Sequence, residues 1–514
     1  MPDNSINNKR IAKNTLFLYL RMIIVMGIGL YTVRAILDLL GVVDYGIYNV
    51  VGGVVAMFSF INGTLATSSQ RYFSIELAKG DMKRLNQWFC LNITTFSIFI
   101  LLFIAIAETI GLWFVNTQMT IPAERMLAAN VVYQFSIITF CIHFFNVPYN
   151  ALIIAHERMN AFAYISIVEA LCKLGIVFVL TYISWDRLII YGLLMFLTSC
   201  GVTSSYIIYS HRFFAESRFH YYWNRQEIKN LFGFSSWHLL GTLSVVIRSQ
   251  GINILINLFF NPAVNAARAV AYQINTAIGQ LSNNFFIAVK PEMYKSYATG
   301  QMSALHKLVI RSSVICIFLI SVLNLPFYVN TSFILGLWLK EIPEYAIIFT
   351  QLVLINGLID SPSGSTICPA LATGRIKKFY LYTSGIYILN LPVSFIFLKF
   401  GYDATITMLV SICLSFVALI IRAYLLIGLI NFPFSNYMKI IGRTIIATLF
   451  ILFTLYGVCE LSDNKWMTLF TTILVSTVLH VILYMFFIFE KSDRMRIIAF
   501  AVSKIQHKRQ INYK

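Results

Sequence analysis

The stretch FGFSSWHLLGTLSVVIRSQGINILINL occupies residues 232–258 and contains one charged side chain, Arg248. A run of about 20 apolar residues is long enough to cross the hydrocarbon core of a bilayer as a helix. An arginine near the middle of such a run costs about 2.5–3.5 kcal/mol on membrane-insertion scales, so it should face protein or water rather than lipid tails. This segment therefore predicts a membrane-spanning helix that carries a functional cation.

Apolar runs of this kind fill most of the chain. Hydrophobic residues make up 58% of the sequence and charged residues 12%, a composition that a soluble protein of 514 residues could not bury. We predict an all-α integral membrane protein with about 14 transmembrane helices. The predicted spans are 15–37, 45–68, 89–115, 126–150, 161–183, 188–210, 232–258, 263–289, 309–333, 344–366, 378–399, 404–427, 441–460 and 466–489.

Basic residues are concentrated in alternate loops. One set of loops, which includes both termini, holds 28 of the 39 lysines and arginines, and the opposite set holds 5. Because cytoplasmic loops are enriched in lysine and arginine, both termini are predicted in the cytoplasm. The net charge of +18 follows from this bias, so nucleic-acid binding is not expected. The eight cysteines form no CxxC pair and the eight histidines show no ligand spacing, so neither a metal site nor a cofactor is expected.

Two parts of the sequence repeat. A shift of 220 residues aligns Ala78, Gly80, Met82 and Leu85 with identical residues, and a shift of 217 aligns Ala155, Arg158 and Phe162 with identical residues. Six spans separate each pair, so the halves share one orientation, as in transporters built from parallel repeats. We predict two parallel-related six-helix lobes and two C-terminal helices. The predicted parts are an N-terminal lobe at 1–210, a cytoplasmic linker at 211–231, a C-terminal lobe at 232–430, the last two helices at 431–490 and a basic cytoplasmic tail at 491–514.

Three arginines within the spans are candidates for a hydrated central cavity. Arg248 lies too deep to reach the headgroups easily, and Arg21 lies about two turns inside the first span. Arg268 opens the eighth span, and Tyr272 and Asn275 follow it on the same helix face. A guanidinium group stays charged and matches phosphate oxygens with a planar fork of donors. The alternative is that these arginines only hold helices together through hydrogen bonds.

Two further pairs of charges have the i,i+4 spacing that brings side chains together on one helix face. Arg34 and Asp38 lie near one end of the first span and are candidates for an interfacial ion pair. Glu169 and Lys173 lie inside the fifth span, where a structural ion pair is the favoured interpretation and coupling to transport is the alternative.

Single charges within the remaining spans have simpler explanations. Glu108 lies near the outer end of its span, where an interfacial role and proton coupling are both open. Asp360 precedes the helix-breaking sequence Ser361–Gly364, so capping of the break is the simple interpretation, and a role in coupling or in a structural ion pair is the alternative. Arg422 lies near the inner end of its span and is expected to extend to the headgroups.

Several motifs resemble one known family. The chain resembles the multidrug/oligosaccharidyl-lipid/polysaccharide (MOP) exporter superfamily along almost its whole length, and more closely the Wzx-type flippases of O-antigen and capsule repeat units. These motifs identify a family better than a cargo. They are LGVVDYGIYN at 40–49, QRYFS at 70–74 with KGD at 79–81, PYNA at 148–151 with AHERM at 155–159, and KP at 290–291 with YATG at 297–300.

The resemblance implies a V-shaped pair of lobes in the bacterial inner membrane. It also implies transfer of an undecaprenyl-diphosphate-linked oligosaccharide from the cytoplasmic to the outer leaflet, with membrane lipids and other glycan assembly proteins as further partners. By position in the family, Arg21 and Arg268 would lie in the central cavity, whereas Arg248 has no assigned counterpart. The helices at 441–460 and 466–489 would form a groove for the lipid tail. Coupling to protons or sodium ions is left open.

Two alternatives remain. An exporter of cationic drugs with the same fold would need acids in its cavity, but the spans hold six cations and four acids. A membrane glycan polymerase or glycosyltransferase would need a sizeable outward loop with catalytic groups, and every outward loop of this chain is short.

Overall fold

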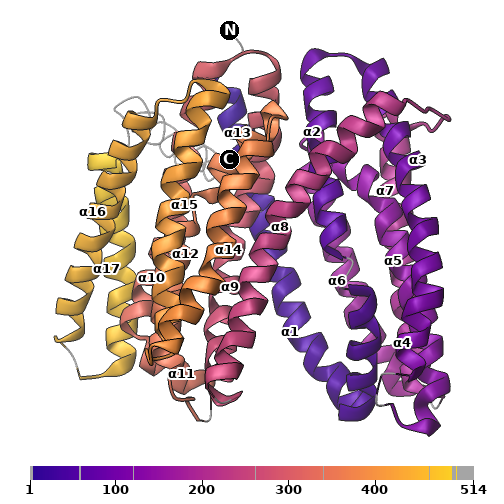
Figure 1. The fold of residues 1–514 in the computed structure, drawn as a ribbon, viewed down its shortest axis with the longest axis horizontal. Helices are drawn as coiled ribbons and strands as arrows, with labels where there is room; N and C mark the ends of the chain where they lie inside the picture. Colours follow the sequence, from indigo (N-terminus) through magenta and orange to yellow (C-terminus); the bar gives the residue numbers. More distant parts are fainter. Residues whose placement is uncertain are drawn as a thin grey trace, which may run out of the picture. The chain divides into compact units, whose positions relative to one another are not determined.

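A computed structural model of the chain (Figure 1) describes residues 4–56, 59–117, 119, 121–183, 185–260, 262–339, 341–461, 463–488 and 494. The predicted basic tail at 491–514 lies outside the described residues, apart from Arg494. Over the described ranges the chain forms helices and no strand.

The helices follow one another with short connections. Two π-helical segments, η1 (Ala107–Gly111) and η4 (Tyr484–Ile488), and two 3-10 turns, η2 (Ala123–Arg125) and η3 (Ala215–Ser217), extend or separate them. The α-helices are α1 (Asn4–Ala56), α2 (Ser59–Lys79), α3 (Met82–Ile106), α4 (Leu112–Thr117), α5 (Met126–Ala155), α6 (Met159–Tyr182), α7 (Arg187–Phe213), α8 (Arg225–Phe259), α9 (Pro262–Ala298), α10 (Met302–Val329), α11 (Thr331–Trp338), α12 (Ala346–Asp360), α13 (Ser363–Thr373), α14 (Lys377–Lys399), α15 (Ile406–Ile430), α16 (Phe434–Cys459) and α17 (Lys465–Leu483).

Twelve helical segments in the described part of the chain are long and apolar enough to cross a membrane. The other two predicted spans, 45–68 and 263–289, are also largely helical, but they do not meet this criterion. The first runs across the end of α1 and the start of α2, and the second, within α9, is rich in asparagine and glutamine. The all-α membrane fold is therefore confirmed, whereas the count of 14 spans is not.

The chain divides into two compact units. Unit 1 comprises Met1–Val246, Asn283–Leu305 and Cys368–Ser384, and unit 2 comprises Ile247–Ser282, His306–Ile367 and Gly385–Lys514. These units follow from contacts in space, whereas the predicted lobes at 1–210 and 232–430 follow from the sequence repeat and stay a prediction. The boundary between the units cuts α8, α9, α10, α13 and α14, so one end of each of these helices belongs to each unit.

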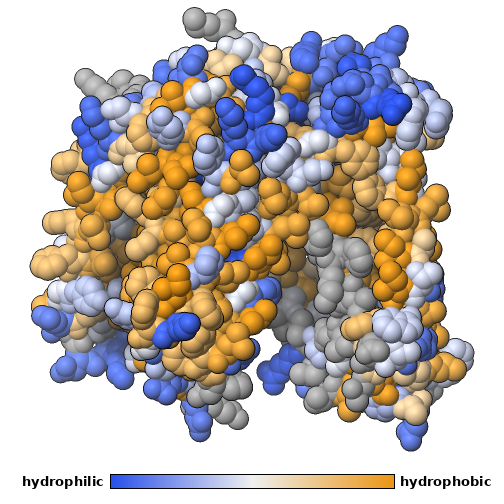
Figure 2. Space-filling model, in the orientation of Figure 1, coloured by the Kyte–Doolittle hydropathy of each residue, from blue (hydrophilic) through white to orange (hydrophobic). Residues whose placement is uncertain are grey.

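Apolar side chains cover the middle lengths of the helices, and hydrophilic residues gather at the helix ends (Figure 2). Many of these apolar side chains are exposed to the surroundings, for example Leu101 at 68% and Phe453 at 79%. A soluble protein rarely exposes large contiguous apolar surfaces. This distribution is what a helix needs when lipid tails surround its middle and water surrounds its ends.

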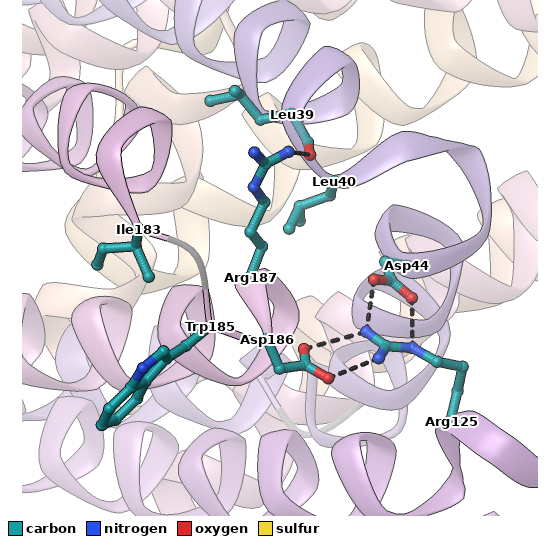
Figure 3. A pocket seen from close by; sticks show the side chains of 8 residues that line it. All are labelled: Leu39, Leu40, Asp44, Arg125, Ile183, Trp185, Asp186 and Arg187. Carbon is teal, nitrogen blue, oxygen red and sulfur yellow. Dashed lines mark hydrogen bonds and ion pairs between the residues drawn. The ribbon is translucent and has the colours of Figure 1, made fainter.

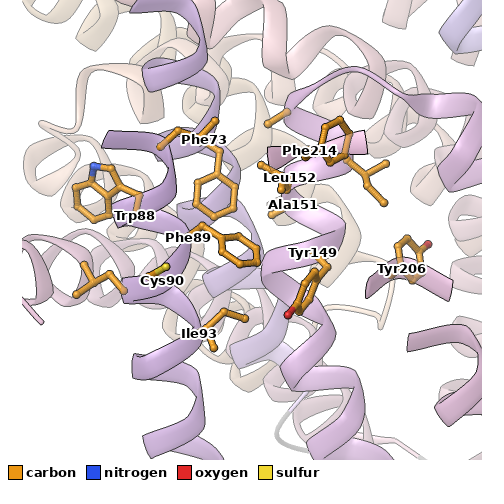
Figure 4. Close-up of a cluster of buried hydrophobic side chains, with 14 of the residues drawn as sticks. Phe73, Trp88, Phe89, Cys90, Ile93, Tyr149, Ala151, Leu152, Tyr206 and Phe214 are labelled. Atoms are coloured by element: carbon orange, nitrogen blue, oxygen red, sulfur yellow. The ribbon is translucent and has the colours of Figure 1, made fainter. Parts of the chain in front are cut away.

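The interior of unit 1 contains a cluster of aromatic and aliphatic side chains from α2, α3, α5 and α7 (Figure 4). Phe73, Phe89 and Leu152 in this cluster are completely buried. At its edge, the rings of Tyr72 and Trp88 stack with their centroids 3.9 Å apart. Because lipid tails are as apolar as these side chains, close van der Waals packing contributes more to helix association here than exclusion from water.

Unit 2 is built around the contact of α8, α9, α12 and α15. Ile256 of α8, Ala271 of α9, Phe349 of α12 and Met408 of α15 are all buried in one cluster. Small residues permit close approach of α9 and α12, because a Cβ atom on Gly357 would collide with the side-chain oxygen of Asn275. This packing places the end of α12 next to the polar residues of α14 and α15.

Two turns repeat as the sequence predicts. Gly80 after α2 and Gly300 after α9 have positive φ values of 75° and 72°, which glycine adopts at little cost. Around each, the same backbone hydrogen bonds form at an offset of 220 residues: Gly80 N–H to Leu77 O and Gly300 N–H to Tyr297 O. The repeat therefore holds at the level of hydrogen bonds.

Helix α13 ends in unit 1 against a buried arginine. Arg71 donates from Nε to Leu371 O at 2.6 Å and from Nη2 to Ala372 O at 3.1 Å. A cation at a helix C-terminus is stabilised by the negative end of the helix dipole. The next residue after the helix, Gly374, has a φ of 74°, and a Cβ atom there would lie 2.7 Å from Arg71 Nη2. A larger residue at position 374 would therefore strain the backbone and displace the end of the Arg71 side chain.

Candidate functional site

The candidate site lies in unit 2, around three arginines and one aspartate. Arg248 projects from α8, and its side chain is 15% exposed. Its guanidinium lies over the ring of Tyr387 at 4.5 Å from the ring centroid, and Nη1 is 3.5 Å from Ser415 Oγ. The distance from Nη2 to Asp360 Oδ2 is 3.9 Å, beyond hydrogen-bond range. Arg248 is therefore held loosely.

Arg422 of α15 is held much more tightly. Its side chain is 1% exposed, and Nη1 donates to the hydroxyl of Tyr387 at 2.7 Å. Nη2 lies 3.5 Å from Asp360 Oδ1. The expectation that Arg422 extends to the headgroups is wrong. Its side chain points from α15 toward α12 and α14, where it contacts Asp360 and Tyr387.

Asp360 is the last residue of α12, where the helix breaks before α13 as the sequence predicts. Its Oδ2 accepts a hydrogen bond from Ser415 Oγ at 3.1 Å, and Oδ1 accepts one from Ser363 Oγ at 3.4 Å. The guanidinium groups of Arg248 and Arg422 both approach this one carboxylate, at 3.9 and 3.5 Å. Two guanidinium groups against one carboxylate leave a surplus of one positive charge.

Arg268 of α9 adds to this surplus. Its side chain is nearly buried, with 3% exposed, and lies over the ring of Tyr272 at 4.4 Å. Nη1 donates to Asn253 Oδ1, and Nη2 lies 3.4 Å from Ser249 O. Ser249 follows Arg248 directly in α8, so Arg268 contacts the backbone of α8 next to Arg248.

The predicted site residues are therefore partly brought together. Arg248, Arg268 and Tyr272 lie in unit 2, and Asn275 packs against Gly357 in the same unit. Arg21 lies in unit 1, so a cavity that it would share with the others stays a prediction.

Arg21 has its own surroundings. Its guanidinium lies 4.5 Å from the ring centroid of Phe162, and its Nε finds no hydrogen-bond partner among the described residues. The charge of Glu169 and the hydroxyl of Tyr206 are close enough to act on it. Glu169 also forms the predicted ion pair with Lys173, at 2.6 Å.

The two remaining predictions for charged residues have different outcomes. Arg34 and Asp38 are both exposed, and no ion pair joins them in the described structure, so the predicted interfacial pair is wrong. With arginine before aspartate, the pair has the less favourable order along a helix. Glu108 lies in the π-helical segment η1 and accepts a hydrogen bond from Gln134 Nε2 at 3.1 Å. It is held by a neighbouring amide rather than by a cation.

A second charged cluster, in unit 1, was not expected from the sequence. Arg125 pairs with Asp44 and with Asp186, each at 2.5 Å (Figure 3). Burial acts to raise the pKa of Asp186, but the hydrogen bonds from Arg125 and from the first backbone N–H groups of α7 lower it below the usual value. The cluster lines a pocket of about 350 Å³, whose walls are formed by Leu39, Leu40, Asp44, Arg125, Ile183, Trp185, Asp186 and Arg187.

Tyr387, Ser415 and Arg422 are the parts of the unit 2 site that sequence reasoning missed. Each lies on a predicted helix, but nothing in a single sequence pairs them with Asp360. One available signal was Arg422 itself, because it is the only charged residue in the 25 residues of α15.

The fold is similar to solved transporters. It matches an outward-facing multidrug resistance MATE family transporter of the MOP superfamily with a TM-score of 0.67 and 12% identity, over 80% of this chain and 94% of that chain. It matches a MATE protein in complex with MaD5 with a TM-score of 0.70 and 12% identity, over 84% of this chain and 97% of that chain. A MOP superfamily transporter from Pyrococcus furiosus, described by the reverse polarity of its binding pocket, matches with a TM-score of 0.65 and 12% identity, over 80% and 94%.

Sequence comparison is more specific about the family. No curated protein matches the chain by sequence. The family model described as "Polysaccharide biosynthesis protein" matches residues 11–296, which is more than half of the chain. The chain therefore belongs to the polysaccharide biosynthesis protein family of the MOP superfamily, and it is a multi-pass membrane protein with the fold of a transporter.

Proposed function

We propose that this chain is a flippase for an undecaprenyl-diphosphate-linked oligosaccharide, the repeat unit of a surface polysaccharide such as O-antigen or capsule. It moves the headgroup from the cytoplasmic to the outer leaflet of the bacterial inner membrane by alternating access, with both termini in the cytoplasm. The observation that carries this proposal is the positive surplus in unit 2, where Arg248 and Arg422 share one carboxylate, Asp360, and Arg268 adds a further positive charge.

The chemistry of the substrate suits this surplus. A diphosphate presents several negative oxygens, and each guanidinium can bind two of them with parallel hydrogen bonds. Inside a helix bundle the effective dielectric is lower than in water, so the attraction is stronger than at a surface. The exposed apolar sides of the helices let the polyprenyl tail stay among lipid tails while the headgroup crosses.

The family description supports a role in polysaccharide biosynthesis. The main alternative is export of cationic drugs, because multidrug resistance transporters share the fold. A cationic drug would be repelled by a site with more arginines than carboxylates. The Pyrococcus furiosus relative is a precedent, since the reverse polarity of its pocket was taken to suggest a different function on the same fold.

The test uses cells whose own copy of the gene has been deleted and that carry the wild-type gene, Arg248→Ala, Arg268→Ala or Arg443→Ala. Arg443 is the control, because it is an exposed arginine of α16 in the same unit. Hydrogen bonds to charged groups contribute about 1.5–3 kcal/mol, so loss of Arg248 should lower export by roughly 10- to 100-fold. Surface polysaccharide and membrane protein are measured in parallel.

We expect surface polysaccharide to be lost with Arg248→Ala and strongly reduced with Arg268→Ala, at normal protein levels, while lipid-linked repeat units accumulate. Arg443→Ala should restore polysaccharide fully. Full export in both site variants would contradict the proposal. Resistance to cationic dyes conferred by the wild-type gene, without any effect on polysaccharide, would favour the multidrug alternative.

A further inference from the structure

The contacts of Asp360 are unequal. Its carboxylate accepts hydrogen bonds from Ser415 and Ser363 and lies 3.5 Å from the buried Arg422, so it is held from three directions. Its distance to Arg248 is longer, at 3.9 Å. Asp360 can therefore lose Arg248 without losing its other partners.

The two arginines differ in the same way. Arg422 is 1% exposed and bonds the hydroxyl of Tyr387, which makes it part of the packed interior. Arg248 is 15% exposed, lies over the face of the same ring, and makes only a long contact to Ser415 Oγ at 3.5 Å and to Asp360 at 3.9 Å among the described residues. Tyr387 thus lies between Arg422, which is fixed by its hydrogen bond, and Arg248, which can still bind another anion.

A carrier that moves an anion in one direction must return empty. An arginine that is desolvated without a counter-charge is costly, because removing one partner of a buried charge pair typically destabilises by several kcal/mol. Arg248 therefore needs an anion in the empty state as well as in the loaded state. Asp360 is the carboxylate that lies within reach in the described structure.

We propose that Asp360 is an internal stand-in for the substrate's diphosphate. In the empty carrier it neutralises Arg248, and on binding the diphosphate takes its place at Arg248 while Asp360 stays with Arg422, Ser415 and Ser363. After release of the substrate, Asp360 returns to Arg248. This inference rests on the proposed function, since it assumes a diphosphate-linked substrate. Asp360 is then a positioning residue that competes with the substrate for Arg248.

The test is a double variant, Asp360→Asn with Arg422→Gln, that removes the competitor without changing the local charge. In the wild type, Arg248 and Arg422 against Asp360 give one net positive charge; in the double variant Arg248 alone gives the same. A gain in anion affinity then arises from lost competition and not from a stronger overall field. Asn has the size of Asp and keeps one acceptor oxygen, and Gln is shorter than Arg but keeps an N–H donor for the hydroxyl of Tyr387.

Purified full-length proteins in detergent micelles are titrated with undecaprenyl diphosphate, and the dissociation constant is measured. We expect the double variant to bind about tenfold more tightly than the wild type, which corresponds to the loss of one weak ionic competitor. Export of the native substrate should fall by a similar factor, because the diphosphate leaves Arg248 more slowly. Equal or weaker binding by the double variant would overturn the proposal.

The single variant Asp360→Asn decides the question if the double variant does not fold, since it keeps the bond between Arg422 and Tyr387. It should bind at least as tightly as the expected double variant, and no gain would overturn the stand-in role. The proposed function fails in a different way: the wild type would not bind undecaprenyl diphosphate at all, and Arg248→Ala would export normally. Loss of binding in Arg248→Ala without any gain in either Asp360 variant would remove only the stand-in role.

Discussion

The two charged clusters have opposite stoichiometry. In unit 1, the single cation Arg125 forms ion pairs with two carboxylates, Asp44 and Asp186, at 2.5 Å each. In unit 2, the single carboxylate Asp360 lies 3.9 Å from Arg248 and 3.5 Å from Arg422. Short, saturated contacts join chain segments that are far apart in sequence, as a structural brace does. Long, unsaturated contacts leave a cation able to take another partner, which is the property a transport site needs.

The largest effect is expected for the unit 2 cluster, with the substitution Arg248→Lys. Lysine keeps the charge but lacks the planar fork of donors that binds two oxygens at once. We expect export of the polysaccharide precursor to fall about tenfold, between the wild type and Arg248→Ala, at unchanged protein level. The measurement is the initial rate at which surface polysaccharide appears after induction. Wild-type rates with lysine would show that charge alone is needed.

The second prediction concerns the structural cluster of Arg125, Asp44 and Asp186 in unit 1. Arg125→Ala leaves Asp44 and Asp186 facing each other without a cation, and we expect a loss of about 1–2 kcal/mol in the free energy of unfolding, discounted because these groups are partly exposed. Export per folded molecule should change little. Thermal unfolding of the purified protein in detergent checks this.

Arg187→Ala is the matched control, because Arg187 lines the same pocket but, among the described residues, donates to the carbonyl oxygen of Leu39 rather than to a carboxylate. Its unfolding midpoint should stay near that of the wild type. If Arg125→Ala unfolds at the wild-type temperature but loses export, the Arg125 cluster is part of the transport machinery and the structural role assigned to it is wrong.

The smallest expected difference compares Gly374→Ala with Gly300→Ala. Both glycines have positive φ values, 74° and 72°, so both changes strain the backbone by roughly 1 kcal/mol. Only at Gly374 does the added Cβ also meet the guanidinium of Arg71, whereas nothing lies within 4 Å of the equivalent atom at Gly300. Gly374→Ala should therefore be less stable by about 1 kcal/mol more. Equal unfolding midpoints would show that Arg71 can move aside.

Much of the fold could be predicted from the sequence, because long apolar runs are a local signal. The equivalence of Gly80 and Gly300 was also predictable, since a repeated turn repeats its residues. The number of spans was harder to predict. Helix α9 contains Arg268 and several asparagine and glutamine residues, and these polar side chains weaken the hydropathy signal that would identify it as a span.

The candidate site was predictable only as a set of cations. The depth of Arg248 in its span singled it out, and in the structure Arg268 contacts the carbonyl oxygen of the next residue, Ser249. Its partners could not be predicted, because Tyr387 and Ser415 lie 139 and 167 positions away in sequence and look like ordinary residues of apolar helices. The expectation for Arg422 was wrong for a related reason: position along a helix does not reveal which neighbour a side chain faces.

The most direct test of the central claim is the affinity of purified wild type, Arg248→Ala and Arg125→Ala for undecaprenyl diphosphate, measured in the same detergent. If the cation-rich cluster of unit 2 is the diphosphate site, Arg248→Ala should bind roughly 10- to 100-fold more weakly, and Arg125→Ala should bind like the wild type despite its lower stability. Undiminished binding by Arg248→Ala, or an equal loss in both variants, would contradict the account.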